Sequence, residues 1–332
     1  MEWKKIAVLG AGSWGTALAL SLAKNGRSVC LWGRNSASMA EMERTRENKK
    51  YLPGVRIDEN VSFTDNAREA LAGAEAAVYV VPAQAFRSCF QDTHACLKAE
   101  IPVINCAKGI ERGTHRLISQ IAAEIRPDVR FAVLSGPSHA EEVARGLPTT
   151  LTAASKDFGT AACVQDLFMS DSLRVYTSLD VVGTELGGAL KNIIALGAGI
   201  SDGMGYGDNA KAALMTRGLR EMARLGAALG ADRNTFTGLS GVGDLIVTCT
   251  SMHSRNRRCG IMIGEGTAPD EATEKVGMVV EGMYTTEAAY ELAEACGVEM
   301  PITEQIYRVI RGDVTAEEAV RTLMGREKKH ED

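Results

Sequence analysis

Three closely spaced glycines near the start of the chain could hold a diphosphate. Gly10, Gly12 and Gly15 lie between a β-branched run at 6–10 and a helix-like stretch, A-L-A-L-S-L-A. In this setting the first glycine permits a tight turn, the second lets a pyrophosphate approach the backbone, and the third lets the helix pack on the strand. The phosphates would accept hydrogen bonds at the helix N-terminus. The stretch therefore predicts a dinucleotide site, with a glycine-rich turn that binds nothing as the alternative.

The end of the second expected strand is where such a site contacts the ribose. An acidic residue is common there in NAD-selective sites, whereas this chain has Gly33-Arg34-Asn35. Arg34 could pair with a 2′-phosphate or stack on adenine, which favours NADPH over NADH or tolerates both. The alternative is an arginine that is merely exposed after a strand.

Two further expected strand ends carry polar side chains. Lys108, in N-C-A-K-G-I-E, could hold a substrate oxyanion, although exposed loop lysines are common. Ser138 and Glu141 have the spacing of a capping box, so a helix is expected to begin there. Its N–H groups and the Ser138 hydroxyl could bind a polar ligand, or the helix could simply be well capped. His139 is expected to orient other groups or to be structural.

Lys191 interrupts the apolar stretch L-K-N-I-I-A-L-G-A-G-I, where a charge is costly unless it is paired or functional. Small residues at helical spacing would leave room for the lysine or for a ligand, namely Gly187, Gly188, Ala195 and Ala198. Burial can lower the pKa of a lysine, which would let it exchange a proton near neutral pH. The alternative is a side chain that extends along the apolar surface to solvent.

Asp244 follows the glycine string of G-L-S-G-V-G-D-L. A buried carboxylate needs a cation, and Lys191 is the candidate partner. The alternative is an aspartate that caps a helix N-terminus.

The segment Ser254-Arg255-Asn256-Arg257-Arg258 concentrates three guanidinium groups and two polar side chains. Arginine binds phosphate through two parallel hydrogen bonds, so the segment predicts a phosphate-sized site. A solvated basic turn and a nucleic-acid patch are the alternatives. The lack of aromatic residues between the arginines and the net charge of −5 count against nucleic acid.

The elements that would position these residues divide the chain into two parts. β-branched runs alternate with helix-like segments at 6–10, 29–33, 76–81, 102–107, 131–136 and 149–154. This alternation predicts an α/β, Rossmann-type domain over residues 1–180, a mostly parallel sheet with helices on both faces. After a strand-like run at 173–178, residues 181–325 predict an all-α substrate and catalytic domain, including an amphipathic helix at 282–297. Residues 326–332 are expected to form a polar tail.

Composition excludes several classes of protein. A chain of 332 residues with 45% hydrophobic content can bury a core in each of two domains. The net charge argues against nucleic acid or an acidic membrane as the main partner. Eight scattered cysteines without a C-x-x-C pair indicate neither zinc nor a disulfide framework, and favour reduced thiols in the cytoplasm. The apolar runs are too short for a transmembrane helix, so no membrane anchor is expected.

Taken together, several long motifs resemble those of bacterial NAD(P)-dependent sn-glycerol-3-phosphate dehydrogenases. They match in order from residue 4 to about residue 325: G-A-G-S-W-G-T-A-L-A, C-A-K-G-I-E, S-G-P-S-H-A-E-E-V-A, L-K-N-I-I-A-L-G-A-G, G-D-N-A-K-A-A-L, G-L-S-G-V-G-D-L and S-R-N-R-R. The resemblance implies reversible hydride transfer between glycerol 3-phosphate and dihydroxyacetone phosphate, mainly toward glycerol 3-phosphate for phospholipid synthesis. It also implies a homodimer.

The resemblance assigns roles residue by residue. The proton donor and acceptor falls on Lys191, with Asp244 beside it and Lys108 touching both substrate and nicotinamide. Substrate positions fall on Gly136, Ser138, Ser254, Arg255 and Asn256, with Asn192 and Thr248 as supporting contacts. Cofactor positions fall on Ser13, Trp14, Arg34, Ala140, Val279 and Glu281, and Arg255 serves both ligands.

Two rival interpretations share parts of this pattern. A β-hydroxyacid or phosphosugar-acid dehydrogenase has a similar glycine loop, helical second domain and lysine, but its substrate carries a carboxylate. A nicotinamide-sensing regulatory protein could keep the fold without catalysis. The joint presence of Lys191, Asp244 and Arg255 argues against the second rival.

Overall fold

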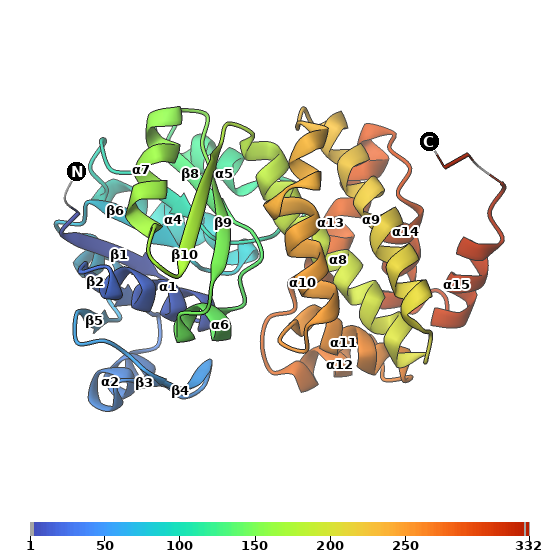
Figure 1. Cartoon of the computed structure of the whole chain (residues 1–332), viewed down its shortest axis with the longest axis horizontal. Coiled ribbons are helices and arrows are strands. Elements are labelled where there is room, and N and C mark those ends of the chain that lie inside the picture. The colour runs from blue at the N-terminus through green and yellow to red at the C-terminus, as the bar shows by residue number, and fades with distance from the viewer. Residues whose placement is uncertain (1–2, 329, 332) are drawn as a thin grey trace. The chain divides into compact units, whose positions relative to one another are not determined.

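The computed structural model describes residues 3–328 and 330–331. The described chain divides into two compact units (Figure 1). The first comprises the residues up to 108 together with 116–185, and the second comprises 109–115 and the residues from 186 onward. Within the predicted polar tail, residues 329 and 332 lie outside the described residues, and the others form neither helix nor strand.

The first unit is built on an eight-stranded sheet with the order β10-β9-β8-β7-β6-β1-β2-β5. All neighbouring strands are parallel except β8 and β9, which are antiparallel. This confirms the predicted mostly parallel sheet. The strands are β1 (Lys5–Leu9), β2 (Ser28–Trp32), β5 (Val61–Thr64), β6 (Ala76–Tyr79), β7 (Val103–Asn105), β8 (Phe131–Ser135), β9 (Thr149–Ala154) and β10 (Leu173–Ser178).

Helices cover both faces of this sheet, which explains why the strands are apolar over most of their length. Alternate residues of β1 enter different cores: Ile6 and Val8 pack with α1, α6 and α7, whereas Ala7 and Leu9 pack with α3, α4 and α5. The helices of this unit are α1 (Ser13–Lys24), α2 (Ser36–Thr45), α3 (Ala67–Leu71), α4 (Ala83–Thr93), α5 (Ile118–Ile125), α6 (Ala140–Arg145) and α7 (Phe158–Phe168).

Three strands were not predicted. β5 forms one edge of the sheet, and β3 (Glu47–Asn48) pairs antiparallel with β4 (Leu52–Arg56) outside it. β5 has only four residues and β3 only two, and β4 contains a proline and a glycine. Such short segments lack the apolar run by which the central strands are recognised.

The second unit is helical, as predicted, and is organised around α8 (Val181–Gly203). Residues 186–201 of this helix are all buried, which is the pattern of a central core helix. The predicted helix at 282–297 is α13 (Glu281–Cys296), which ends at Gly297 with a left-handed φ of 64°. The other helices are α9 (Asp208–Ala228), α10 (Asp244–Thr250), α11 (Arg255–Gly264), α12 (Pro269–Val276), α14 (Pro301–Ile310) and α15 (Ala316–Met324).

In the part of the chain that the structure describes, no helix combines the length and apolar character needed to cross a membrane.

Candidate functional site

The turn between β1 and α1 has the geometry expected of a diphosphate cradle. Gly10 has a φ of 126°, and a Cβ there would lie 2.5 Å from the Val80 carbonyl oxygen. A Cβ on Gly15 would lie 1.8 Å from the Gly10 carbonyl oxygen, so the helix packs directly on the turn. A Cβ on Gly12 would meet nothing within 4 Å, so the backbone at the start of α1 is open to an approaching group. These residues fit a dinucleotide pyrophosphate.

The other predicted cofactor residues of the first unit lie at helix starts or strand ends. Ser13 and Trp14 are the first two residues of α1, and the buried indole Nε1 of Trp14 has no hydrogen-bond partner among the described residues. Arg34 is exposed directly after β2 and Gly33, while the next residue, Asn35, caps α2. Ala140 is the first residue of α6. An orphaned indole N–H beside the open glycine turn is consistent with a ligand that accepts a hydrogen bond there.

Lys108, Gly136 and Ser138 meet at one backbone carbonyl. Lys108 Nζ donates to the Gly136 oxygen at 2.9 Å, and Ser138 Oγ donates to the same oxygen at 2.9 Å. The predicted capping box of Ser138 and Glu141 is therefore wrong. The Ser138 hydroxyl turns back to Gly136, the helix starts at Ala140, and His139 occupies the N-cap position without a side-chain cap.

In the second unit, Lys191 and Asp244 form the buried ion pair that was predicted. Lys191 is 6% exposed and Asp244 is 1% exposed. Lys191 Nζ lies 2.5 Å from Asp244 Oδ1 and donates to Thr248 Oγ1 at 2.7 Å. The Thr248 hydroxyl in turn donates to the Asp244 backbone carbonyl at 2.6 Å. The lysine does not extend to solvent, and Asp244 is the first residue of α10 rather than its N-cap.

The predicted open face of α8 around Lys191 is partly filled. A Cβ on Gly187 would lie 2.2 Å from the Ser240 carbonyl oxygen, because the π-helical turn Leu239–Gly243 packs directly on α8 at that position. The glycine string before Asp244 is thus a turn that packs on α8. The close approach brings the start of α10, and with it Asp244, to the lysine.

Cys249 is a neighbour of this pair that the sequence did not single out. It lies on α10 one residue after Thr248 and is fully buried. Burial raises the pKa of its thiol to about 12, against the opposing effect of the Lys191 and Arg257 charges. The thiol is therefore protonated at neutral pH and serves as a small apolar packing group beside the lysine.

A chain of hydrogen bonds connects α8 with the starts of α11 and α13. Asn256 Nδ2 donates to Asn192 Oδ1 at 2.9 Å, and Asn256 Oδ1 accepts from the Gly282 backbone N–H at 2.8 Å. A Cβ on Gly282 would lie 2.7 Å from the Asn192 carbonyl oxygen, so the three segments are in direct contact. Lys191 and Asn192 thus share a helix with a direct link to the segment that carries Asn256.

The predicted phosphate segment forms the start of α11. Ser254 is the N-cap, and its side chain accepts from the Arg257 backbone N–H. Arg255 is the first helical residue. Arg257 does not contribute a guanidinium to a phosphate site as predicted, because its side chain pairs with Asp202 at 2.7 Å.

Two predicted cofactor residues lie where α13 begins. Val279 is 38% exposed, and Glu281 is the first residue of the helix. The residue between them, Val280, is fully buried at the N-cap and fixes the entry into the helix.

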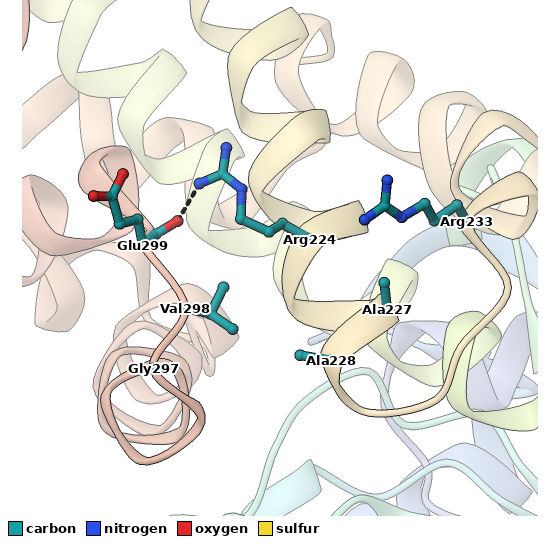
Figure 2. A pocket seen from close by; sticks show the side chains of 7 residues that line it. All are labelled: Arg224, Ala227, Ala228, Arg233, Gly297, Val298 and Glu299. Atoms are coloured by element: carbon teal, nitrogen blue, oxygen red, sulfur yellow. Dashed lines mark hydrogen bonds between the residues drawn. The ribbon is translucent and has the colours of Figure 1, made fainter.

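A pocket of about 660 Å³ elsewhere in the second unit is lined by other residues (Figure 2). Arg224, on α9, donates to the Glu299 backbone carbonyl, so its guanidinium is engaged in joining two chain segments. The lining residues are Arg224, Ala227, Ala228, Arg233, Gly297, Val298 and Glu299. The predicted site residues are not among them.

Nearly the whole chain is similar to known proteins of one family. Two family models match, described as the N-terminus and the C-terminus of NAD-dependent glycerol-3-phosphate dehydrogenase, over residues 5–161 and 180–321. The chain is 55% identical over 331 residues to a glycerol-3-phosphate dehydrogenase (NAD(P)+) of Geobacillus kaustophilus (strain HTA426), covering 99% of this chain and 96% of the relative. The corresponding protein of Enterococcus faecalis (strain ATCC 700802 / V583) is 52% identical over 331 residues, covering 99% and 97%.

A solved structure shows the same fold. The crystal structure of glycerol-3-phosphate dehydrogenase from Coxiella burnetii is 39% identical in sequence and superposes with a TM-score of 0.93, covering 98% of this chain and 99% of that one. With both family models and full-length relatives in agreement, the chain belongs to the NAD-dependent glycerol-3-phosphate dehydrogenase family.

Proposed function

We propose that this protein transfers hydride reversibly between NAD(P)H and dihydroxyacetone phosphate, giving sn-glycerol 3-phosphate. The observation that carries the proposal is the buried group of Lys191, Asp244 and Thr248. A lysine held at 2.5 Å from one carboxylate and 2.7 Å from one hydroxyl is the arrangement expected of a proton donor to a carbonyl oxygen.

The cofactor is NADH or NADPH, and its diphosphate rests on the turn of Gly10, Gly12 and Gly15. Ser13 and Trp14 contact it at the start of α1, and the Trp14 indole N–H finds its acceptor there. Arg34 is exposed at the end of β2, where it can pair with a 2′-phosphate, so NADPH is favoured. The remaining cofactor contacts come from Lys108, Ala140, Arg255, Val279 and Glu281.

The phosphate of the substrate is bound at the start of α11. Ser254, Arg255 and Asn256 are consecutive residues at the N-terminus of a ten-residue helix, where the positive end of the helix dipole and the Arg255 charge favour an anion. Asn192 extends this set through its hydrogen bond with Asn256. Lys108, Gly136 and Ser138 are the other proposed substrate contacts.

The bound nicotinamide supplies the hydride. Lys191 Nζ gives a proton to the carbonyl oxygen as negative charge develops on it, and takes the proton back in the reverse reaction. Asp244 and Thr248 fix the position of the amine, since both accept from it. Holding the phosphate at α11 and the carbonyl oxygen at α8 leaves the substrate little freedom, and this positioning contributes to the rate.

The product, sn-glycerol 3-phosphate, supplies glycerophospholipid synthesis in this proposal, and the enzyme acts in the cytoplasm as a homodimer. Each of the eight cysteines is a free thiol in the structure, which fits a reducing compartment.

The test follows oxidation of the reduced nicotinamide with dihydroxyacetone phosphate as substrate, using NADPH and NADH in parallel, in the wild type and in Lys191→Ala. The wild type is expected to oxidise both cofactors, NADPH more efficiently, and the variant to bind cofactor but turn over far more slowly. Activity with 3-hydroxyacids but not with dihydroxyacetone phosphate would assign the chain to another reaction. Cofactor binding without turnover on any substrate would contradict the proposal.

A further inference from the structure

Two helices of the second unit pack in direct backbone contact along a seam of four glycines. On α8, a Cβ on Gly199 would lie 2.1 Å from the Arg257 carbonyl oxygen, and one on Gly203 would lie 2.2 Å from the Ile261 oxygen. On α11, a Cβ on Gly260 would lie 2.1 Å from the Leu196 oxygen, and one on Gly264 would lie 2.3 Å from the Ile200 oxygen. In each helix the two glycines are four residues apart and lie on one face.

This glycine seam brings the two helix backbones into direct contact, since a Cβ at any of the four positions would lie 2.1–2.3 Å from a carbonyl oxygen. Small residues permit close approach through their lack of a Cβ, whereas interdigitating side chains are what normally fix how far one helix can slide along another. Charged side chains beside the seam add a directional interaction to this packing of α11 on α8.

A carboxylate at the seam supplies that interaction. Asp202 lies on α8 between Gly199 and Gly203 in sequence, and its two oxygens are held from different helices. Oδ2 accepts from Arg257 of α11, through Nε at 2.8 Å and Nη2 at 2.7 Å. Oδ1 lies 2.8 Å from Lys211 Nζ of α9. The three side chains are 13–16% exposed, so solvent screens the pairs much less than it screens surface ion pairs.

Arg257 also holds the turn that leads into α11. Its Nη1 donates to the Thr250 backbone carbonyl at 3.2 Å and contacts the Met252 sulfur at 2.9 Å. One guanidinium thus joins α8, the end of α10 and the segment before α11. A lysine could not reproduce this, because it lacks the fork of donors.

The residues held in this way are those that bind the phosphate in the proposed function. Ser254, Arg255 and Asn256 lie within one helical turn of Arg257, while Lys191 lies on the same helix as Asp202. The position of α11 along α8 therefore sets the distance between the phosphate-binding residues and the proton-donating lysine.

We propose that Asp202, Arg257 and Lys211 are positioning residues that fix α11 on α8 so that the substrate phosphate and carbonyl reach their partners together. The inference rests on the proposed function. It explains why Arg257, one of the three arginines of the segment, pairs with Asp202 and not with a phosphate.

The test compares Asp202→Asn with the wild type for two substrates, dihydroxyacetone phosphate and dihydroxyacetone, which lacks the phosphate. The variant keeps the size of the side chain but loses the charge that attracts Arg257 and Lys211. For the phosphorylated substrate, KM is expected to rise roughly tenfold or more while kcat changes much less, since small displacements of a binding group can cost up to about a hundredfold. For dihydroxyacetone, kcat/KM is expected to stay close to the wild-type value.

Lys211→Met is a milder variant, because it removes only one of the two cations that pair with Asp202. It replaces Asp202→Asn in the test if that variant does not fold. Lys211→Met is expected to raise the KM for dihydroxyacetone phosphate by a smaller factor than Asp202→Asn does. Lys211→Arg, which keeps the charge, is expected to show a KM close to that of the wild type. Glu271→Gln is the control, because it removes an exposed ion pair with Lys275 on α12. Thermal unfolding of each variant checks whether the fold is retained.

Three results separate the possibilities. Equal losses for both substrates would mean that the cluster is merely structural, and would overturn the inference. An unchanged KM for dihydroxyacetone phosphate in the folded variants would also overturn it. A wild type that does not reduce dihydroxyacetone phosphate at all would instead overturn the proposed function.

Discussion

At the scale of single residues, Lys191 combines a structural role with the proposed chemical one. Its ammonium is buried against Asp244, and removing one partner of such a pair leaves a buried charge, which costs about 3–5 kcal/mol. A loss of activity in a single variant therefore cannot be assigned to chemistry alone. A second substitution that removes the orphaned charge separates the two roles.

We expect Lys191→Met to lower kcat for dihydroxyacetone phosphate by on the order of a thousandfold, as for loss of a general acid. The double variant Lys191→Met/Asp244→Asn should regain much of the lost free energy of unfolding but none of the activity. Denaturant unfolding and steady-state kinetics measure the two effects. Recovery of turnover in the double variant would show that the lysine acts only through the fold.

At the scale of an element, the turn from β1 into α1 has an open backbone position at Gly12, the proposed ligand contact, and a packing contact at Gly15. Gly15→Ala places a methyl group 1.8 Å from the Gly10 carbonyl oxygen, so α1 must shift, and we expect a loss of about 1–3 kcal/mol in stability. Gly12→Ala places its methyl group in open space, at a φ of −78° that any residue adopts.

Gly12→Ala should therefore leave stability within about 1 kcal/mol of the wild type. We expect it to weaken NADPH binding by at least roughly tenfold, because the methyl group occupies the approach of the pyrophosphate. Fluorescence titration with NADPH and thermal unfolding of both variants test whether Gly12→Ala loses affinity for NADPH and Gly15→Ala loses stability. Normal NADPH affinity in Gly12→Ala would show that the diphosphate does not rest on this turn.

The same element shows what the sequence can predict. The tight turn at Gly10, the open backbone at Gly12 and the close packing at Gly15 follow from local spacing. The central strands do so as well, because their apolar runs reflect burial on both faces. The pairing of Lys191 with Asp244 could also be inferred, because a charge in an apolar helix requires a partner.

What the sequence did not predict depends on contacts between distant segments. Arg257 was counted among the three guanidinium groups of a predicted phosphate-sized site, and only the packing of α11 on α8 brings it to Asp202. The open face expected at Gly187 is filled by a turn more than 50 residues away in sequence, at Ser240. The Ser138 hydroxyl binds Gly136 instead of capping a helix. Local patterns carry no information about such competing partners.

At the scale of the whole molecule, a buried carboxyl makes stability depend on pH in an unusual direction. Glu185, at the start of α8, is 5% exposed, and burial raises its pKa to about 7, against the lowering effect of hydrogen bonds from Ser119. In the unfolded chain the same group ionises near 4.5. Below that pH it is protonated in both states. As the pH rises toward 7, only the unfolded state releases the proton, so the folded state loses stability, by about 3 kcal/mol above pH 7.

Glu185→Gln should remove this dependence without disturbing the contacts, since the amide oxygen can accept from the Ser119 N–H at 2.9 Å and the amide nitrogen can donate to the Ser119 hydroxyl. We expect the variant to gain stability over the wild type as the pH rises from 4.5 to 8, by up to about 3 kcal/mol. Urea unfolding at a series of pH values measures the difference between the two proteins. The other titratable groups are present in both proteins, so their contributions cancel in this difference. One of them is Glu221, because burial also raises its pKa to about 7. Glu271→Gln, at an exposed position, is the control and should show no such trend. If the difference in unfolding free energy between Glu185→Gln and the wild type stays constant with pH, Glu185 is ionised in the folded protein throughout this range.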